Sequence, residues 1–481
     1  MRFDSTFVAG LMASAVAGRA TPRSVVDRPI VAHYMVGGLQ NNDVRQDILD
    51  AKNIGLDGFA LNFDQFEWWS NDTVTYMFNN AEDIGGFSLF FSFDHGHGVL
   101  KSPMDYADYF TRYSTYPSYL KMRDPSDNVD KPLLSTFGGE DFTDDDWNKF
   151  KGKVGNVLVV PGFSEIYNPS TSFFNSRTAL DGVFNWNSWP ATQDGKVTVS
   201  AATDRTFQTA ADKANKLFMM GISPVQYKHL SNKDNWYRRG EDNLENRFGQ
   251  ILDLQPDMVQ LQTWNDAGEG HYMGKLHSDP LDDRTELLTD DYDHTGYWQI
   301  LQPFIAAWKR GDRTTANMHP TDGKAVQGTF WHHTLTVGGT CYDDDVAKSG
   351  DIAKAAEDAV SGVVLVPEGK TNLVAVVNVG TKELNKTNLR PGFNKFKFTG
   401  LEKLIPGKVQ LEVWDESTMV GGGYGKEQHA VLVATGKAKG LEEQRATARL
   451  TVRSKGVKDY TRTEIDRENK RQKLEIKEHN E

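Results

Sequence analysis

Eight short apolar stretches, separated by polar loops and by segments with helical spacing, dominate the chain from Pro29 to about Arg310. Strands that are buried on both faces read as nearly continuous apolar runs, and helices between them make the strands parallel. The repeat therefore predicts alternating strands and helices. The predicted strands are Ile30–Val36, Gly58–Phe63, Phe87–Phe93, Leu133–Phe137, Val157–Val160, Gly182–Trp186, Leu217–Ile222 and Met258–Trp264.

Helical spacing fills most of the intervals, and only the interval after Val160, where Ser164–Ser176 is loop-like, is weak. The predicted helices are Val44–Lys52, Val74–Asp83, Asp105–Tyr113, Asp144–Lys153, Arg205–Lys216, Leu244–Leu252 and Tyr297–Arg310. Eight such units over about 280 residues fit a (β/α)8 TIM-like barrel, whose usual size is about 250 residues. A doubly wound sheet is the alternative, but it normally has fewer strands and a phosphate-binding glycine turn, and no G-x-G-x-x-G or Walker sequence follows these strands.

The pattern changes after Gly311 to short alternating stretches rich in Val, Thr and aromatic residues, which are typical of an all-β sandwich. We therefore predict a catalytic barrel over residues 29–315 and a β-sandwich over 318–454, with Trp331 and Trp414 in its core. Residues 455–481 form a charged tail. The predicted strands are Gly328–Val337, Ser361–Val366, Asn372–Val379, Asn394–Thr399, Val409–Trp414, Ala430–Val433 and Ala446–Val452.

Residues 1–20 have the features of a signal peptide: a short apolar run of small residues that ends in a small-x-small cleavage pattern at Ala15–Ala17. The run is too short to cross a bilayer, and a secreted protein is expected. A plain N-terminal tail is the alternative, because Asp4 offsets the charge of Arg2. The sequons at Asn71 and Asn385 are usable only if the chain is secreted.

Charge and cysteine content exclude several classes. The chain has 54 basic and 66 acidic residues, a net charge of −12, and such a field repels nucleic acid and anionic membranes. Cys341 is the only cysteine, which excludes an intramolecular disulfide framework and a Cys-based zinc site.

The active site of a (β/α)8 barrel lies at the C-terminal ends of its strands, so the residues that follow each predicted strand are the candidates. They are rich in carboxylates, amides and aromatic rings, which suit hydroxyl binding and stacking on sugar rings. The candidate substrate-binding residues are His33, Tyr34, Asn62, His95, Trp186, Trp189, Tyr227, Trp236, Arg239, Asp242, Trp264, Asn265 and His271.

Three carboxylates stand out as candidate catalytic groups. Asp266 and Glu269 follow the eighth strand three residues apart, a spacing that makes them neighbours within a helical turn, and Asp94 follows the third strand. Such a set can protonate a leaving oxygen and activate water. His95 and His97 lack a third ligand at metal spacing, so no metal site is predicted.

Ordered motifs around these residues resemble glycoside hydrolase family 71, the fungal α-1,3-glucanases or mutanases. They are Ala32–Gly37, Asp57–Asn62, Phe90–Asp94, Ser135–Phe137, Asn235-Trp236 with Arg239-Gly240 and Asp242, and Trp264–Glu269. The resemblance covers about residues 29–310. It implies endo-acting hydrolysis of α-1,3-glucan with inversion and without a cofactor, with catalytic carboxylates at Asp94, Asp266 and Glu269.

The sequence departs from the family's pattern at several positions. Ala267 and Gln226 stand where aromatic residues are usual, Gly138 replaces a common Glu, and the Trp expected near Leu244 is missing. The leading hypothesis is a secreted, monomeric glucan hydrolase whose partner is the polysaccharide. A carbohydrate-binding paralogue with little hydrolysis, and a hydrolase of another glucan linkage, are the alternatives.

Overall fold

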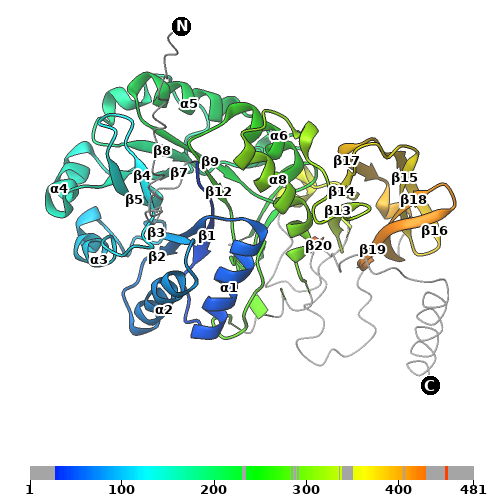
Figure 1. Cartoon of the computed structure of the whole chain (residues 1–481), viewed down its shortest axis with the longest axis horizontal. Coiled ribbons are helices and arrows are strands. Elements are labelled where there is room, and N and C mark those ends of the chain that lie inside the picture. Colours follow the sequence, from blue (N-terminus) through cyan, green and yellow to red (C-terminus); the bar gives the residue numbers. More distant parts are fainter. Residues whose placement is uncertain are drawn as a thin grey trace, which may run out of the picture.

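The computed structural model has two parts, a curled parallel sheet surrounded by helices and a pair of antiparallel sheets beside it (Figure 1). It describes residues 28–428, except 230–234, 283–284, 287–288, 290–291, 335, 339–349 and 405–406, together with 450–452. The predicted signal peptide, Cys341, the strand Ala430–Val433 and the charged tail lie outside the described residues.

The parallel sheet has the strand order β4-β5-β3-β2-β1-β12-β9-β8-β7, and only β4 runs antiparallel to its neighbour. Its strands are β1 (Ile30–Met35), β2 (Gly58–Phe63), β3 (Ser88–Asp94), β4 (Lys121–Arg123), β5 (Asp130–Phe137), β6 (Leu158–Val159), β7 (Gly162–Phe163), β8 (Gly182–Asn185), β9 (Leu217–Ile222) and β12 (Met258–Leu261). β6 pairs with β5 and β7 pairs with β8, and only Val160 and Pro161 separate β6 from β7. Strands β5 and β8 are therefore each paired with one half of a broken strand.

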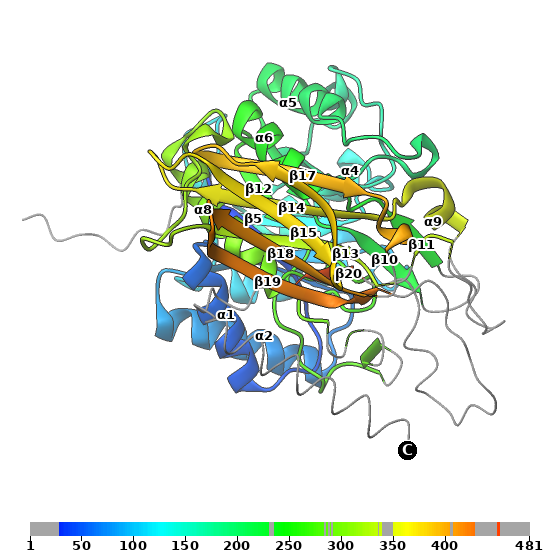
Figure 2. The ribbon, with the colours of Figure 1, turned by 90° about the vertical axis from the view of Figure 1, so that its right-hand side faces the viewer.

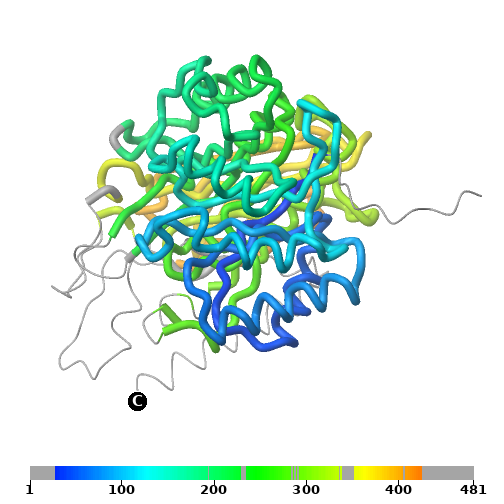
Figure 3. The backbone as a smooth tube through the Cα atoms, turned by 90° about the vertical axis from the view of Figure 1, so that its left-hand side faces the viewer, coloured from blue at the N-terminus to red at the C-terminus, as the bar shows by residue number. Residues whose placement is uncertain are grey.

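Helices follow most strands and cover the outer face of the sheet (Figure 3). They are α1 (Asn41–Ile54), α2 (Trp68–Ile84), α3 (Ala107–Tyr113), α4 (Asp144–Val154), α5 (Ala202–Ala214), α6 (Leu244–Leu254) and α8 (Trp298–Arg310). Between β7 and β8 the structure has only a 3₁₀ turn, Phe173–Ser176, which agrees with the weak helical signal there. Because strands such as β2 are buried along their whole length, continuous apolar runs identified them.

An aspartate precedes three of the parallel strands and fastens each to its neighbour. The amides of Ile30, Val159 and Phe218 donate to the carboxylates of Asp57, Asp181 and Asp257, at 3.0, 2.8 and 2.8 Å. These carboxylates lie at the N-terminal ends of the strands, the face that contributes stability rather than catalysis in such sheets.

The C-terminal part contains two four-stranded antiparallel sheets, ordered β17-β14-β13-β20 and β16-β15-β18-β19 (Figure 2). One apolar cluster takes buried side chains from both sheets, including Phe330, Val364, Val377 and Leu411. The strands are β13 (Gln327–His333), β14 (Ala359–Val366), β15 (Leu373–Val379), β16 (Lys382–Asn388), β17 (Gly392–Thr399), β18 (Gly407–Asp415), β19 (Thr418–Gln428) and β20 (Leu450–Val452).

The sequence did not predict β16 and β19. The residues of β16 are mostly exposed and polar, and β19 carries Gly421, Gly422 and Gly423, so neither shows the apolar alternation of a half-buried strand. A short helix, α9 (Gly350–Ala355), was also missed.

The two parts share a core. Trp331 of β13 is 1% exposed, packs against Tyr297 and donates its indole N–H to the carbonyl of Gly240 at 3.1 Å. The ring of Phe393 in β17 meets Phe248 of α6. The prediction that Trp331 is a core residue is confirmed, whereas Trp414 is half-buried and donates to Glu412 at 2.9 Å.

No helix among the described residues is long and apolar enough to cross a membrane. Of the two sequons, Asn71 lies within α2, and its Thr73 is buried and donates to the carbonyl of Gly37 at 2.6 Å. Asn385 is exposed on β16.

Candidate active site

The loop after β12 brings two of the three predicted catalytic carboxylates together. The side-chain Nε2 of His271 lies 3.1 Å from Oδ2 of Asp266 and 3.7 Å from Oε2 of Glu269. The amide of Glu269 donates to Oδ1 of Asp266 at 3.0 Å. The neighbour relation expected from their spacing is therefore present, and one buried imidazole joins both groups.

Residues on both sides of this loop hold it in place. Asn265 pairs with the backbone of Met35, accepting from its amide at 2.8 Å and donating to its carbonyl at 3.0 Å. Trp264 is fully buried, and its indole N–H donates to Asp47 at 3.1 Å. Asp47 also accepts the hydroxyl of Tyr34 at 2.7 Å. Asn265, Trp264 and Tyr34 were predicted as substrate contacts, but these bonds make them supports of the loop.

Asp94 ends strand β3, as predicted, and is 6% exposed. The amide of Gly96 donates to its Oδ1 at 2.7 Å. Burial raises the pKa of Asp94 against the effect of this hydrogen bond, and the charges of Asp64 and Asp266 raise it further. The field of Asp266 thus reaches Asp94 from a different part of the sheet. Beside it, Asp64 pairs with the exposed His97 at 3.2 Å.

The pKa values of Asp266 and Glu269 move in opposite directions. Burial acts to raise the pKa of Asp266, but the hydrogen bond and charge of His271 and the amide of Glu269 outweigh it, and the pKa is lowered. Burial and then the negative charge of Asp266 raise the pKa of Glu269. The pKa of Asp266 is therefore shifted towards the ionised form and that of Glu269 towards the protonated form, a separation that suits acid–base catalysis.

A hairpin, β10 (Gln226–His229) and β11 (Asn235–Arg238), lies over the carboxylate loop. The side-chain amide of Gln226 donates to Oε2 of Glu269, and the backbone amide of Tyr227 donates to the carbonyl of Glu269 at 2.9 Å. Lys228 Nζ lies 3.5 Å from Oε1 of Glu269 and 4.3 Å from the ring centre of Trp236. The predicted residues Tyr227 and Trp236 are thus next to the site.

Sequence reasoning did not single out Gln226 and Lys228 as site residues. They flank Tyr227 at alternate positions of one strand, so they share a face, and that alternation could have identified them once the hairpin was recognised. Gln226 occupies a position where the family usually has an aromatic residue, and here it contacts Glu269 instead.

Trp189 forms part of the same wall. Its indole N–H donates to the carbonyl of Pro224 at 2.6 Å, its ring centre lies 5.8 Å from that of His271, and the guanidinium of Arg238 lies 4.9 Å above the ring. The predicted residues Trp189 and His271 are therefore brought together with the two carboxylates.

Several other predicted contacts have protein partners: His33 and Asn62 are buried in the sheet, and His95 is half-buried in the loop after β3. His33 meets the ring of Trp186 edge-on at 5.0 Å, and burial lowers its pKa to about 3, so it is neutral. Asn62 is 1% exposed and donates to the carbonyl of Ser92 at 2.8 Å. His95 lies against Phe142, with Nδ1 3.1 Å from the carbonyl of Leu100. These residues pack beneath or beside the carboxylates.

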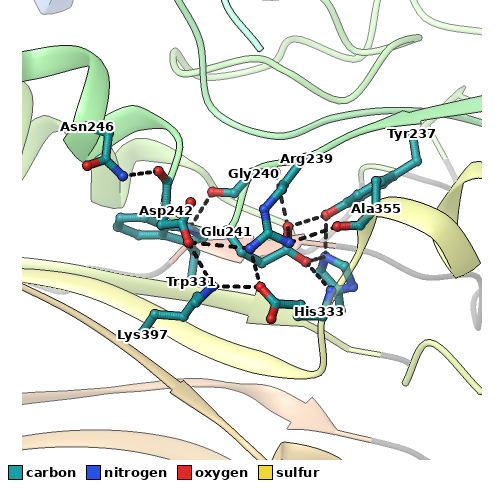
Figure 4. A network of polar contacts seen from close by, with 11 residues as sticks. Tyr237, Arg239, Gly240, Glu241, Asp242, Asn246, Trp331, His333, Ala355 and Lys397 are labelled. Atoms are coloured by element: carbon teal, nitrogen blue, oxygen red, sulfur yellow. Dashed lines mark hydrogen bonds and ion pairs between the residues drawn. The ribbon is translucent and has the colours of Figure 1, made fainter. Parts of the chain in front are cut away.

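Arg239 and Asp242 lie elsewhere, in a polar network between the barrel-like part and the antiparallel sheets (Figure 4). Arg239 is 2% exposed and donates to Glu357 and, at 2.8 Å, to the carbonyl of Ala355. Lys397 bridges Asp242 and Glu357 at 2.7 Å each. The structure therefore does not bring Arg239 and Asp242 to the carboxylate cluster.

The same cluster contains the described residues best placed to share a metal ion. Ligand atoms of Asp266, Glu269 and His271 all lie within 4.8 Å of one another. Two carboxyl groups this close together can also share a proton. The expectation that the protein has no metal site stays a prediction.

Neighbouring carboxylates whose pKa values are driven apart, at the C-terminal ends of parallel strands, are typical of glycoside hydrolases. A sequence model of glycosyl hydrolase family 71 matches residues 26–434, which is most of the chain. The chain belongs to this family, and the resemblance seen in its motifs is confirmed.

The names of three relatives agree with this family assignment. The chain is 30% identical over 297 residues to a glucan endo-1,3-alpha-glucosidase of Schizosaccharomyces pombe, covering 59% of this chain and 67% of the relative. It is 27% identical to a mutanase of Penicillium rubens, covering 67% and 69%. It is 24% identical to an ascus wall endo-1,3-alpha-glucanase of Schizosaccharomyces pombe, covering 83% and 92%.

Proposed function

We propose that this protein hydrolyses α-1,3-glucosidic bonds of glucan, with Asp94, Asp266 and Glu269 as its catalytic carboxylates. The observation that carries the proposal is the contact of the neighbouring carboxylates Asp266 and Glu269 with the buried imidazole of His271, and the opposite directions of their pKa shifts support it. Family membership and the names of the relatives support the substrate.

In the proposed mechanism Glu269 is the general acid. Its proton goes to the glycosidic oxygen as the bond from that oxygen to the anomeric carbon breaks. Asp266, whose two oxygens accept from His271 and from the amide of Glu269, stays ionised and keeps its neighbour protonated. Asp94, in its ionised form, takes a proton from the attacking water.

Asp266 and Glu269 are too close together to be the acid–base pair of an inverting enzyme. Their ligand oxygens lie within 4.8 Å, whereas an inverting pair is about 6.5–9.5 Å apart to leave room for water. Asp94, at the end of strand β3, is therefore the proposed partner at the wider separation. Water then attacks opposite the leaving oxygen, and an α-linkage gives a β-anomeric product.

The finer architecture is part of the same proposal. The pairing of β5 with β6 and of β7 with β8 supports a closed eight-stranded barrel whose fifth strand is broken at Pro161. The shared cluster of the two antiparallel sheets supports a sandwich over residues 318–454. A signal peptide at residues 1–20 would deliver the enzyme outside the cell, where cell-wall glucan is found.

Release of reducing ends from insoluble α-1,3-glucan tests the proposed function. Wild-type protein should release sugar, and Glu269→Gln should release at least a hundredfold less, because a general acid alone contributes about 10²–10⁴. Binding without release by the wild type would overturn the proposal in favour of a carbohydrate-binding paralogue. Release of reducing ends from a glucan of a different linkage, in a panel of glucans, would overturn the proposed substrate.

A further inference from the structure

A cavity lies where helix α6 meets strands β16 and β17. It has a volume of about 610 Å³, within the range of about 300–1,000 Å³ that is usual for ligand sites, which often form between domains. None of the carboxylates of the candidate active site lines it. Its walls come from both parts of the molecule and include Glu245, Thr315, Asn388, Arg390, Phe393 and Lys395.

Glu245 is the unusual residue of this cavity. It is 2% exposed, and its Oε2 has no hydrogen-bond partner in the part of the chain that the structure describes. Burial raises the pKa of Glu245 to about 8, so at neutral pH the carboxyl group is uncharged and has an O–H to donate. A buried polar atom without a partner is costly, and a ligand with hydroxyl groups would satisfy it.

Phe393 supplies a flat apolar surface in the same wall. It is half-buried, and its ring is held by an edge-on contact with Phe248, with 6.4 Å between ring centres. The electron-rich face of an aromatic ring attracts polarised hydrogens, such as the C–H groups on one face of a sugar. The exposed side chains of Asn388 and Arg390 make no hydrogen bond or ion pair within the described ranges, so both are free to bind hydroxyl groups.

The charged groups of the cavity are compatible with a neutral ligand. Glu245 is uncharged, Lys395 donates to Asn246, and the guanidinium of Arg390 can donate to hydroxyl oxygens. Amide, hydroxyl, carboxyl and guanidinium groups around one aromatic ring are the mixture that binds a polyhydroxylated chain. We propose that this cavity is a second glucan-binding site, which holds a short run of neutral sugar units while the barrel cleaves elsewhere on the polymer. The identity of the polymer rests on the proposed function.

Depletion of the protein from solution by insoluble α-1,3-glucan tests this site, in a Glu269→Gln background so that the polymer is not consumed. Phe393→Ala should weaken binding about fivefold to tenfold, the size expected for losing one stacked ring. The double variant Asn388→Ala/Arg390→Ala changes only exposed side chains, so it should fold and should show a loss of the same order. Tyr424→Ala removes a partly exposed ring of the same part that does not line the cavity, and it should bind like the parent.

A second readout separates this inference from the proposed function. In the otherwise wild-type enzyme, Phe393→Ala should lower the ratio of release from insoluble glucan to turnover of a short soluble oligosaccharide by about fivefold. Equal binding by the parent and both cavity variants, or a parent that does not bind glucan, overturns the second site. An enzyme that binds through the cavity but releases sugar from no α-1,3-glucan instead overturns the proposed function alone.

Discussion

Two clusters of buried charged groups in this protein, the interface network around Arg239 and the carboxylate cluster around His271, differ in how their surroundings shift the pKa values. In the interface network, Arg239, Lys397 and Glu357 all have pKa values shifted towards the charged form. Burial opposes these shifts, and the hydrogen bonds and opposite charges of the partners outweigh it. In the carboxylate cluster, burial raises the pKa of Glu269 and of Asp94 towards the neutral form.

The difference comes from how the partners contact the carboxylates. In the interface, Glu357 accepts hydrogen bonds from Lys397 at 2.7 Å and from Arg239, and these outweigh burial. In the carboxylate cluster, Lys228 lies 3.5 Å from Glu269, and burial together with the charge of Asp266 outweighs its effect. The ion pairs of the structural network are completed, whereas the candidate acid Glu269 is shifted towards the form that holds a proton.

The largest effect is expected from the carboxylates themselves. Asp266→Asn, Glu269→Gln or Asp94→Asn should each lower turnover by about 10²–10⁴, because each removes a general acid, a base or the charge that keeps the acid protonated. The midpoint of thermal unfolding should stay at or above that of the wild type in Glu269→Gln and Asp94→Asn, since burial raises the pKa of both groups, and it should fall in Asp266→Asn, which weakens the contact with His271. A variant with near-normal turnover on α-1,3-glucan would remove that residue from the site.

The interface should respond in the opposite way. Arg239→Met leaves Glu357 and Glu241 without their buried partner and should reduce the free energy of unfolding by about 3–5 kcal/mol in urea titrations. Arg205→Met, which breaks an ion pair to Asp253 that is 59% exposed on both sides, is the matched control and should cost less than about 1 kcal/mol. Equal costs for the two variants would contradict the distinction between the clusters.

The pH dependence of kcat/KM should respond to Lys228. The charge of Lys228 lowers the pKa of Glu269, so Lys228→Met should raise that pKa. Because Glu269 acts in its protonated form, activity falls as pH rises through its pKa, and the alkaline limb should move to higher pH. Lys275→Met, which breaks an ion pair with Asp50 away from the cluster, should leave the limb in place. A limb that stays in place or moves to lower pH in Lys228→Met would show that Glu269 is not the acid.

The smallest effect is expected at Gln226. Its hydrogen bond to Glu269 is a single contact to a group that is neutral when active, and a net hydrogen bond is worth about 0.5–1.5 kcal/mol. Gln226→Ala should therefore lower kcat on soluble oligosaccharides by about twofold to tenfold. A loss of a hundredfold or more would place Gln226 among the reacting groups.

The fold was predictable where burial repeats regularly. The apolar runs identified β2 and β9 to the residue. The starts of α4 and α6 were predicted to the residue, whereas those of α1, α2 and α5 were predicted too late. Helix α2 begins at Trp68, not Val74, because its first turns are polar or exposed and carry no apolar period. The strand β16 escaped for the same reason.

The candidate site was predictable only where strand ends determine it. Asp94, Asp266 and Glu269 follow strands β3 and β12 and were found from position and chemistry. Arg239 is also a charged residue within a family motif, yet its partner Glu357 lies 118 residues away in the chain. A single sequence does not reveal such a pairing, so Arg239 was assigned to substrate binding rather than to the interface.

The anomeric form of the first product tests the account most directly. Proton NMR spectra recorded in the first minutes of hydrolysis of a soluble α-1,3-glucan oligosaccharide distinguish the two anomers before mutarotation mixes them. With Glu269 as acid and Asp94 as base on opposite faces of the sugar, the β-anomer should appear first. An initial α-anomer would contradict inversion and would instead assign the closely spaced Asp266 and Glu269 to a retaining mechanism.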